Sequence, residues 1–196
     1  MAKGSGKEKK QERKPVYLHP EFVLRPVALK RTETRRYWLR MRFDTGGEKT
    51  VVVILKNPSR ATGEVSDKTV FNVANYIYKN SRTNPVLKGA GSVVILNLIP
   101  AYETYSERLK ERNEALADNE NLRYIKKFAK EAAVIIAAWG DPPKGLEKEY
   151  TALRDDVMEI LNGSSREIFY VDKLSKKGNP KHGQIWGYAD KMKRMI

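Results

Sequence analysis

Three apolar runs constrain the fold of this chain more than any other feature of its sequence. They cover residues Val51–Leu55, Ser92–Leu98 and Ala133–Ala138. A strand with one face in water alternates polar and apolar residues, whereas a strand covered on both faces is apolar throughout. The three runs therefore predict central strands of a sheet that has helices on both sides, as in an α/β protein.

The segments around these runs predict the remaining elements. Tyr37–Phe43 alternates apolar and basic residues like a half-exposed strand, and Gly46-Gly47 then predicts a hairpin into the first apolar run. Glu167–Val171 is a short last strand. Three segments have apolar residues at helical spacing, the first with Asp67 as a suitable cap: Asp67–Lys79, Asn119–Glu131 and Leu146–Leu161. We expect a three-layer α/β/α sandwich with a mostly parallel central sheet of about four to five strands.

The excess of positive charge lies at the two ends of the chain. The net charge of +14 divides into +4 for residues 1–14, +5 for 15–43, −1 for 44–172 and +6 for 173–196. Basic residues gathered in particular segments are typical of proteins that bind polyanions, because neutralised phosphates release counterions. For residues 1–14 alone, a solubilising role is an equally good interpretation.

The same divisions predict the domain organisation. We expect a disordered basic tail over residues 1–14, because this segment has almost no apolar residue to bury. An extended arm follows over 15–36. A single α/β domain then covers 37–196 and ends in the basic carboxyl-terminal segment.

Composition excludes several classes of site. The chain has no cysteine and only two histidines, His19 and His182, so we expect no metal and no other cofactor. It has neither a Gly-x-x-x-x-Gly-Lys phosphate loop nor a Gly-x-Ser-x-Gly hydrolase elbow. No run approaches the roughly 18 to 20 apolar residues of a membrane span, so we expect a cytoplasmic protein without a membrane partner.

Polar and aromatic signatures follow the predicted strands at their carboxyl ends. Asn57-Pro58-Ser59 follows the first apolar run, Asn97 closes the second, and Trp139-Gly140 follows the third. A fourth signature, Gly178–Gly183, comes after the last strand. Parallel strands end along one edge, where open α/β proteins bind ligands, so we expect the four signatures to share one pocket. Taken singly, each also has a structural explanation as a turn, a loop contact or a core residue.

The chain resembles the bacterial and phage family known as domain of unknown function 1643 (DUF1643). That family typically shows Leu-Asn-Pro-Ser after a strand and a terminal Gly-x-Pro-Arg-His-Pro. Lys56 stands here in place of that leucine, and Gly183 in place of the last proline. The resemblance runs from about residue 35 to about residue 186, and it rests on Val51–Ala61, Asp67-Lys68-Thr69, Asn97-Leu98, Trp139-Gly140 and Gly178–His182.

The same layout is similar, more distantly, to the uracil-DNA glycosylase superfamily, and this resemblance implies a fold and an activity of that type. The implied reaction is excision of a base, normal or modified, by hydrolysis of its N-glycosidic bond. Asn57 would orient the attacking water, and His182 would stabilise the negative charge on the departing base. Asp67 and Asp141 are the carboxylates available for an acid or base role. The base would be bound by Pro58, Ser59, Phe71, Asn97 and Trp139.

Nucleic acid is the expected partner, with DNA ahead of RNA. A protein that extrudes a base must bind the phosphates on either side of it. The basic carboxyl-terminal segment contains four lysines that could do so: Lys173, Lys176, Lys177 and Lys181. Two alternatives stay open. The first is a non-catalytic nucleic-acid-binding protein on the same fold, because the neutral Asn57 cannot act as a general base. The second is an enzyme or sensor that acts on a free nucleotide. The sequence predicts neither the base nor the oligomeric state.

Overall fold

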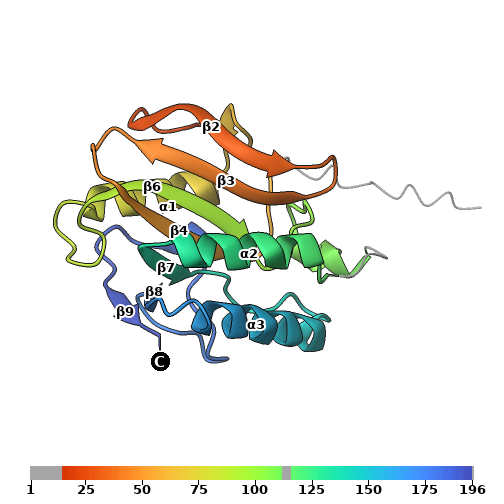
Figure 1. Cartoon of the computed structure of the whole chain (residues 1–196). Helices are drawn as coiled ribbons and strands as arrows, with labels where there is room; N and C mark the ends of the chain where they lie inside the picture. Colours follow the sequence, from red (N-terminus) through yellow and green to blue (C-terminus); the bar gives the residue numbers. More distant parts are fainter. Residues whose placement is uncertain (1–14, 112–115, 196) are drawn as a thin grey trace, which may run out of the picture.

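A seven-stranded sheet runs through the part of the chain that the computed structural model describes, residues 15–111 and 116–195 (Figure 1). Residues 1–14, the expected disordered tail, lie outside that part. In spatial order the strands are β2 (Val23–Arg31), β3 (Arg36–Phe43), β6 (Ala90–Asn97), β4 (Lys49–Leu55), β7 (Val134–Ala137), β8 (Ile168–Val171) and β9 (Met192–Arg194). A separate antiparallel pair consists of β1 (Tyr17–Leu18) and β5 (Val65–Ser66).

The sheet is mixed, and this corrects the predicted fold. The strands β6, β4, β7 and β8 run parallel, whereas β2, β3 and β9 join them through antiparallel pairs. The expected mostly parallel sheet of four to five strands in a glycosylase-like sandwich is therefore wrong. The outer strands lack an apolar run, which is why they were missed. In β2 only Val23 and Val27 are buried and Pro26 interrupts the pattern, and β9 lies in the basic end of the chain.

The predicted hairpin between Tyr37–Phe43 and Thr50–Leu55 is also wrong, because β6 lies between β3 and β4. The connection from β3 to β4 instead crosses the start of β6 with backbone packed on backbone. A Cβ added to Gly91 would lie 1.6 Å from the carbonyl oxygen of Gly47, and one added to Gly47 would lie 2.4 Å from that of Gly89. These glycines are therefore required by a close crossing and not by a hairpin turn.

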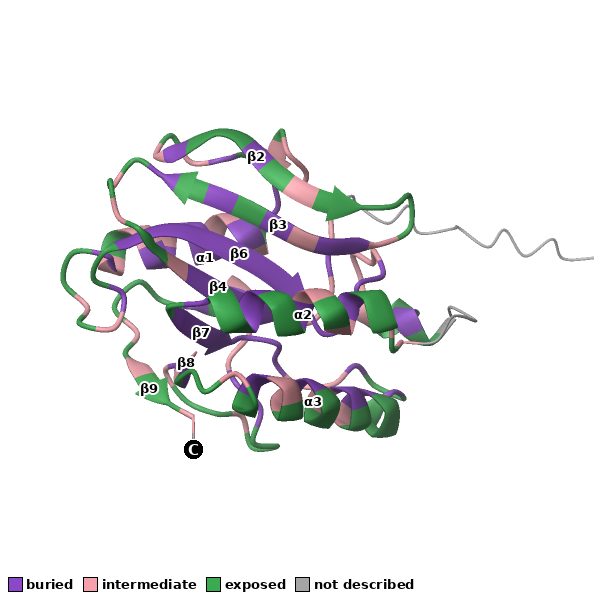
Figure 2. Cartoon of the chain, in the orientation of Figure 1, coloured by how far each residue is buried: buried purple, intermediate pink, exposed green. Residues whose placement is uncertain are grey.

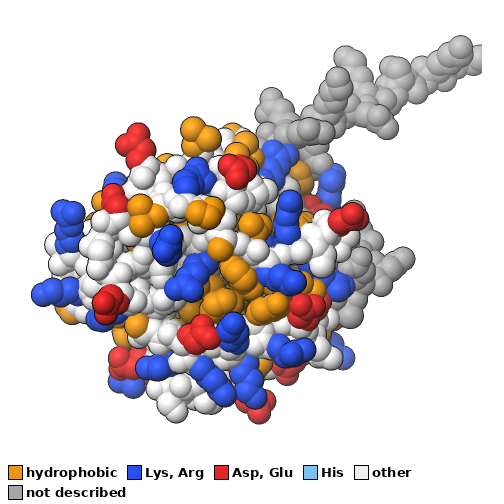
Figure 3. Space-filling view, turned by 45° about the horizontal axis from the view of Figure 1, so that its top comes forward, with side chains coloured by type: hydrophobic (Ala, Val, Ile, Leu, Met, Phe, Trp, Pro, Cys, Tyr) orange, Lys and Arg blue, Asp and Glu red, His pale blue; other side chains and the backbone are white. Residues whose placement is uncertain are grey.

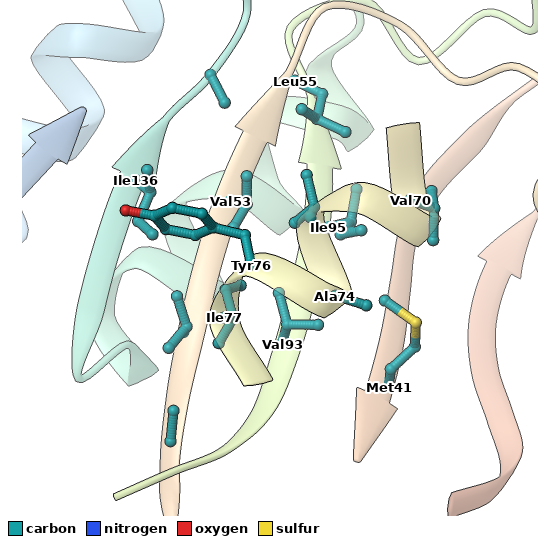
Figure 4. Packing of buried hydrophobic residues seen from close by; sticks show 14 of the residues in the cluster. Met41, Val53, Leu55, Val70, Ala74, Tyr76, Ile77, Val93, Ile95 and Ile136 are labelled. Atoms are coloured by element: carbon teal, nitrogen blue, oxygen red, sulfur yellow. The ribbon is translucent and has the colours of Figure 1, made fainter. Parts of the chain in front are cut away.

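Three α-helices in the described residues cover the sheet, and each lies within one residue of a predicted helix. On one face, α1 (Lys68–Asn80) packs Ala74, Tyr76 and Ile77 over Val53 and Ile95 (Figure 4). On the other face, α2 (Asn119–Glu131) and α3 (Glu147–Asn162) cover the alternate side chains of the same strands. Figure 2 shows β4, β6 and β7 buried between these layers and the outer sides of α2 and α3 exposed.

The helices have lengths and surfaces typical of a globular domain. Fully burying one large aliphatic side chain contributes roughly 1.5 to 3 kcal/mol, so the two clusters beside the sheet supply most of the favourable free energy of folding. None of the helices in residues 15–111 and 116–195 is long and apolar enough to cross a membrane.

The segment 15–36, expected to be an extended arm, contributes β1, β2 and several contacts to the region before α1. A ring nitrogen of His19 lies 3.0 Å from the carbonyl oxygen of Thr62. Arg36 is 1 % exposed, and its guanidinium donates a 3.0 Å hydrogen bond to the carbonyl oxygen of Ala61. The amino-terminal segment thereby fixes the chain that leads from β4 into α1.

Candidate functional site

A hollow of about 550 Å³ opens where β4 ends and α1 begins. We call it the larger hollow. Its walls come from the turn after β4, the first turn of α1, the loop after β6 with the short helix η1 (Ser106–Glu111), and the segment around η2 (Gly183–Ile185). The lining residues are Pro15, Tyr17, Lys56, Asn57, Ser59, Arg60, Asp67, Lys68, Thr69, Glu103, Thr104, Ser106, Glu107, His182, Gln184 and Ile185.

Asn57 holds two of these walls together. Its side-chain nitrogen donates to the carbonyl oxygens of Pro58, at 3.1 Å, and of Glu103, at 2.6 Å. The backbone nitrogen of Glu103 returns a 3.0 Å bond to the carbonyl oxygen of Pro58. The amide nitrogen of Asn57 is thus engaged in structure, and its Oδ1 is the polar atom that remains for a ligand.

Asp67 caps α1 and closes the turn before it. One carboxylate oxygen accepts from the backbone nitrogen of Val70 at 2.9 Å, and the other accepts from those of Arg60 and Ala61 at 3.3 Å each. Both oxygens of this side chain are thus engaged by backbone donors at the amino-terminal end of the helix. Asp67 lines the hollow, but its hydrogen bonds explain it as a structural residue.

His182 is oriented by its own loop. Its Nδ1 accepts a 3.3 Å bond from the backbone nitrogen of Gln184, so in the neutral ring the proton lies on Nε2. The ring packs against Gly140, which has a φ of +70°, and a Cβ at that glycine would lie 3.2 Å from Cβ of His182. The Trp139-Gly140 signature therefore supports the histidine by leaving room for it.

Lys56 is the cation at the end of β4. Its Nζ lies 5.9 Å from the ring centroid of Tyr150, whose hydroxyl donates to the backbone at Trp139. Burial lowers the pKa of Lys56, and the negative charges of Asp141 and Glu107 oppose this shift only in part. The site thus holds a partly desolvated amine beside an aromatic ring.

A smaller hollow of about 440 Å³ adjoins the larger one, because His182 and Ile185 line both. We call it the smaller hollow. Burial raises the pKa of Asp141 in its wall, but hydrogen bonds from Ser175 and Asn179, together with the charges of Lys177 and Lys56, leave that pKa below its ordinary value. Its lining residues are Gly140, Asp141, Asp172, Lys173, Leu174, Ser175, Pro180, Lys181, His182 and Ile185.

The four lysines predicted to hold phosphates divide into two groups. Lys181 donates to Asp172 at 2.9 Å and to Asp190 at 2.7 Å, so its charge is neutralised within the protein. Lys173, Lys176 and Lys177 are exposed on the loop beside the smaller hollow. The exposed three are the ones placed to meet a polyanion.

Asn97 and Trp139 are fully buried and line neither hollow. Both side-chain atoms of Asn97 and the indole nitrogen of Trp139 lack a hydrogen-bond partner within the described residues. The backbone carbonyl of Asn97 accepts a 2.9 Å bond from the side chain of Asn121 on α2. The structure therefore brings Asn57 and His182 to one hollow, as predicted for the strand ends, and leaves Asn97 and Trp139 beneath the surface.

The other predicted base-binding residues lie at different depths. Ser59 lines the larger hollow, and Pro58 is buried behind it. Phe71, on the second turn of α1, is half-buried against Tyr17, with ring centroids 5.5 Å apart. Tyr17 is itself a lining residue, so an aromatic pair stands at the rim of the hollow.

Several lining residues were not predicted from sequence. The loop after β6 contributes Glu103 and Glu107, and β1 contributes Tyr17. None of the three lies in a periodic pattern or in a recognisable motif. Lys56 also lines the hollow and was assigned no role. In its case the sequence does contain a signal, because a charged residue directly after an apolar run is unusual enough to be noticed. Within the described residues, no three histidine, aspartate or glutamate side chains gather as metal ligands.

Comparison with known proteins gives one match. The family model described as "Protein of unknown function (DUF1643)" matches residues 36–183, which is more than half of the chain. No curated protein and no solved structure matched. The matched region runs from the buried Arg36 through His182, so it includes both the turn after β4 and the histidine of the larger hollow.

Proposed function

This chain belongs to the DUF1643 family, and from the geometry of its two hollows we propose that it binds a nucleic-acid strand with one nucleotide seated in the larger hollow. The observation that carries the proposal is that His182 and Ile185 line both hollows, so that the two lie next to each other; we call the pair of hollows the groove. A volume of 550 Å³ lies within the roughly 300 to 1,000 Å³ of small-ligand sites, so a nucleotide fits.

Lysine side chains line both hollows of this groove. Lys56 and Lys68 line the larger hollow, and Lys173 lines the smaller one, with Lys176 and Lys177 on the same loop. A strand that crosses the groove would place phosphates near both groups, and each neutralised phosphate favours binding through counterion release. DNA is proposed ahead of RNA.

Polar atoms within the larger hollow suit a base or a sugar. The Nε2 proton of His182 is a donor, and Oδ1 of Asn57 is an acceptor. The Tyr17–Phe71 pair at the rim offers a ring surface on which a base can stack. These groups support binding of one unstacked nucleotide.

Basic residues are not confined to the groove. The face in Figure 3 shows Lys and Arg side chains spread among acidic ones and around a central group of hydrophobic side chains. A polyanion will therefore be attracted to the protein in general, and a test must separate the groove from the rest of the surface.

Fluorescence anisotropy with labelled single-stranded and double-stranded oligonucleotides over a salt series makes this test. Replacing Lys173, Lys176 and Lys177 together by Ala should weaken binding and reduce the slope of log affinity against log salt by about 2 to 3. The matched control replaces the exposed lysines of α2, Lys126, Lys127 and Lys130, by Ala, and should have a smaller effect. Equal effects of the two variants would contradict the proposal.

Excision of the bound base is a second candidate function, favoured by the tautomer of His182. A donor on Nε2 is what an anionic leaving base requires. The side-chain nitrogen of Asn57 and both carboxylate oxygens of Asp67 make structural hydrogen bonds, so these atoms are assigned no catalytic role. The earlier similarity to uracil-DNA glycosylases supplies no further support, because the expected fold is wrong. An abasic-site assay over oligonucleotides with varied bases tests this activity, which His182→Ala should abolish.

A further inference from the structure

Lys56 in the larger hollow differs from Lys181, which lines the adjoining smaller hollow. Lys181 is held by two carboxylates, whereas Nζ of Lys56 makes no hydrogen bond and no ion pair within the described residues. Nζ of Lys56 lies over the buried ring of Tyr150, 5.9 Å from the ring centroid. A lysine that is enclosed but unpaired is a common form of an amine nucleophile.

The backbone places this amine firmly in the hollow. Lys56 follows β4, the strand flanked by β6 and β7, and its carbonyl oxygen accepts a 2.9 Å bond from the backbone nitrogen of Ile99. The side chain lines the larger hollow together with Ser59, Glu107 and His182. A group on a rigid strand end can meet a bound carbon atom with little reorganisation.

Burial favours the neutral form of Lys56 and lowers the pKa of its amine. The negative charges of Asp141 and Glu107 act in the opposite direction and offset this shift only in part. Asp141 is itself engaged by Ser175 and Asn179. The fraction of reactive amine at neutral pH is therefore larger than for a lysine in water.

We propose that the amine of Lys56 forms an imine with the aldehyde carbon of a phosphorylated sugar in the larger hollow, such as the ring-opened deoxyribose of an abasic site. The nitrogen lone pair attacks the carbonyl carbon, and the carbonyl oxygen leaves as water when the carbon–nitrogen double bond forms. Ammonium plus aldehyde gives protonated imine plus water, so protons balance and no oxidant is needed. Glu107 lines the hollow and can relay the proton from nitrogen to the leaving oxygen.

The nucleic-acid identity of this substrate rests on the proposed function, but the reactivity of Lys56 does not. Two probes separate the two ideas. One is an oligonucleotide with a single abasic site, and the other is ribose 5-phosphate, which carries an aldehyde and a phosphate without a strand. Sodium cyanoborohydride reduces an imine from either probe to a stable amine.

The experiment maps the reduced adduct by peptide mass spectrometry on the full chain. Lys56 should carry the adduct, and its half-maximal labelling should occur below the ordinary lysine pKa of 10.5. Lys56→Arg keeps the positive charge but cannot form the imine, so its adduct should be lost; Lys126→Arg on α2 should react like the unaltered protein. Because the adduct is first mapped on the unaltered protein, the main result does not depend on whether either variant folds.

Each outcome decides a different point. An adduct at Lys56 with both probes supports the inference. An adduct at Lys56 with ribose 5-phosphate alone supports the amine chemistry and contradicts binding of a strand. Adducts spread over surface lysines without preference for Lys56, or no adduct with either probe, would overturn the inference.

Discussion

Replacing Asp67 by Ala should destabilise the protein more than the loss of an ordinary helix cap. The variant removes the acceptor for Val70 at the start of α1 and also the acceptor for Arg60 and Ala61 in the preceding turn. It further removes the carboxylate whose charge acts on the buried guanidinium of Arg36. One residue thus supports a helix end, a turn and a buried charge.

The magnitude follows from these contacts. Loss of an aspartate cap costs about 1 kcal/mol. The two bonds to the turn are long, at 3.3 Å each, and together contribute about 1 to 2 kcal/mol. The expected total is about 2 to 3 kcal/mol, which for a chain of this size corresponds to a fall in Tm of roughly 5 to 10 °C.

Urea denaturation followed by circular dichroism measures this loss. The matched control is Asp118→Ala, because within the described residues Asp118 caps α2 by accepting from one backbone nitrogen, that of Asn121, and it also pairs with Arg35. The control should lose about 1 kcal/mol. If Asp67→Ala loses no more than Asp118→Ala, the structural account of Asp67 is refuted.

Two further predictions concern packing and pH. Gly91→Ala should destabilise the protein by about 1 to 3 kcal/mol or prevent folding, because its Cβ would lie 1.6 Å from the carbonyl oxygen of Gly47; the urea midpoint measures this. A hydrogen bond from Lys181 holds the pKa of Asp190 below its ordinary 3.8. The unfolded state therefore binds the proton more readily, so this contribution is present above pH 3.8 and is lost as the pH falls below it. The free energy of unfolding should therefore fall less in Asp190→Asn than in the unaltered protein as the pH is lowered through this range.

The helices and the inner strands of this fold could be predicted from sequence because each has a regular apolar pattern. Asp67 marked the start of α1, and the runs around Val53, Ile95 and Ile136 marked the strands. The position of β6 between β3 and β4 could not be predicted. It depends on a backbone crossing at Gly47 and Gly91 that looks like an ordinary turn in the sequence.

The meeting of Asn57 and His182 in the candidate site could be predicted from sequence, but most of its lining could not. Asn57 and His182 meet because residues that follow neighbouring strands lie along one edge of the sheet. Asn97 also ends a strand at this edge, but its side chain is fully buried and lines neither hollow. The loop that supplies Glu103 and Glu107 has no periodicity, and its place beside Asn57 depends on hydrogen bonds between distant residues.

The most direct test of the central claim is hydrogen exchange of the full chain with and without a saturating single-stranded oligonucleotide. The proposal predicts slower exchange in three segments, 56–60, 103–107 and 173–185, which form the groove across the two hollows. It predicts little change in α2, which lines neither hollow. Slower exchange confined to β2, β3 or α2, with the groove unchanged, would contradict it.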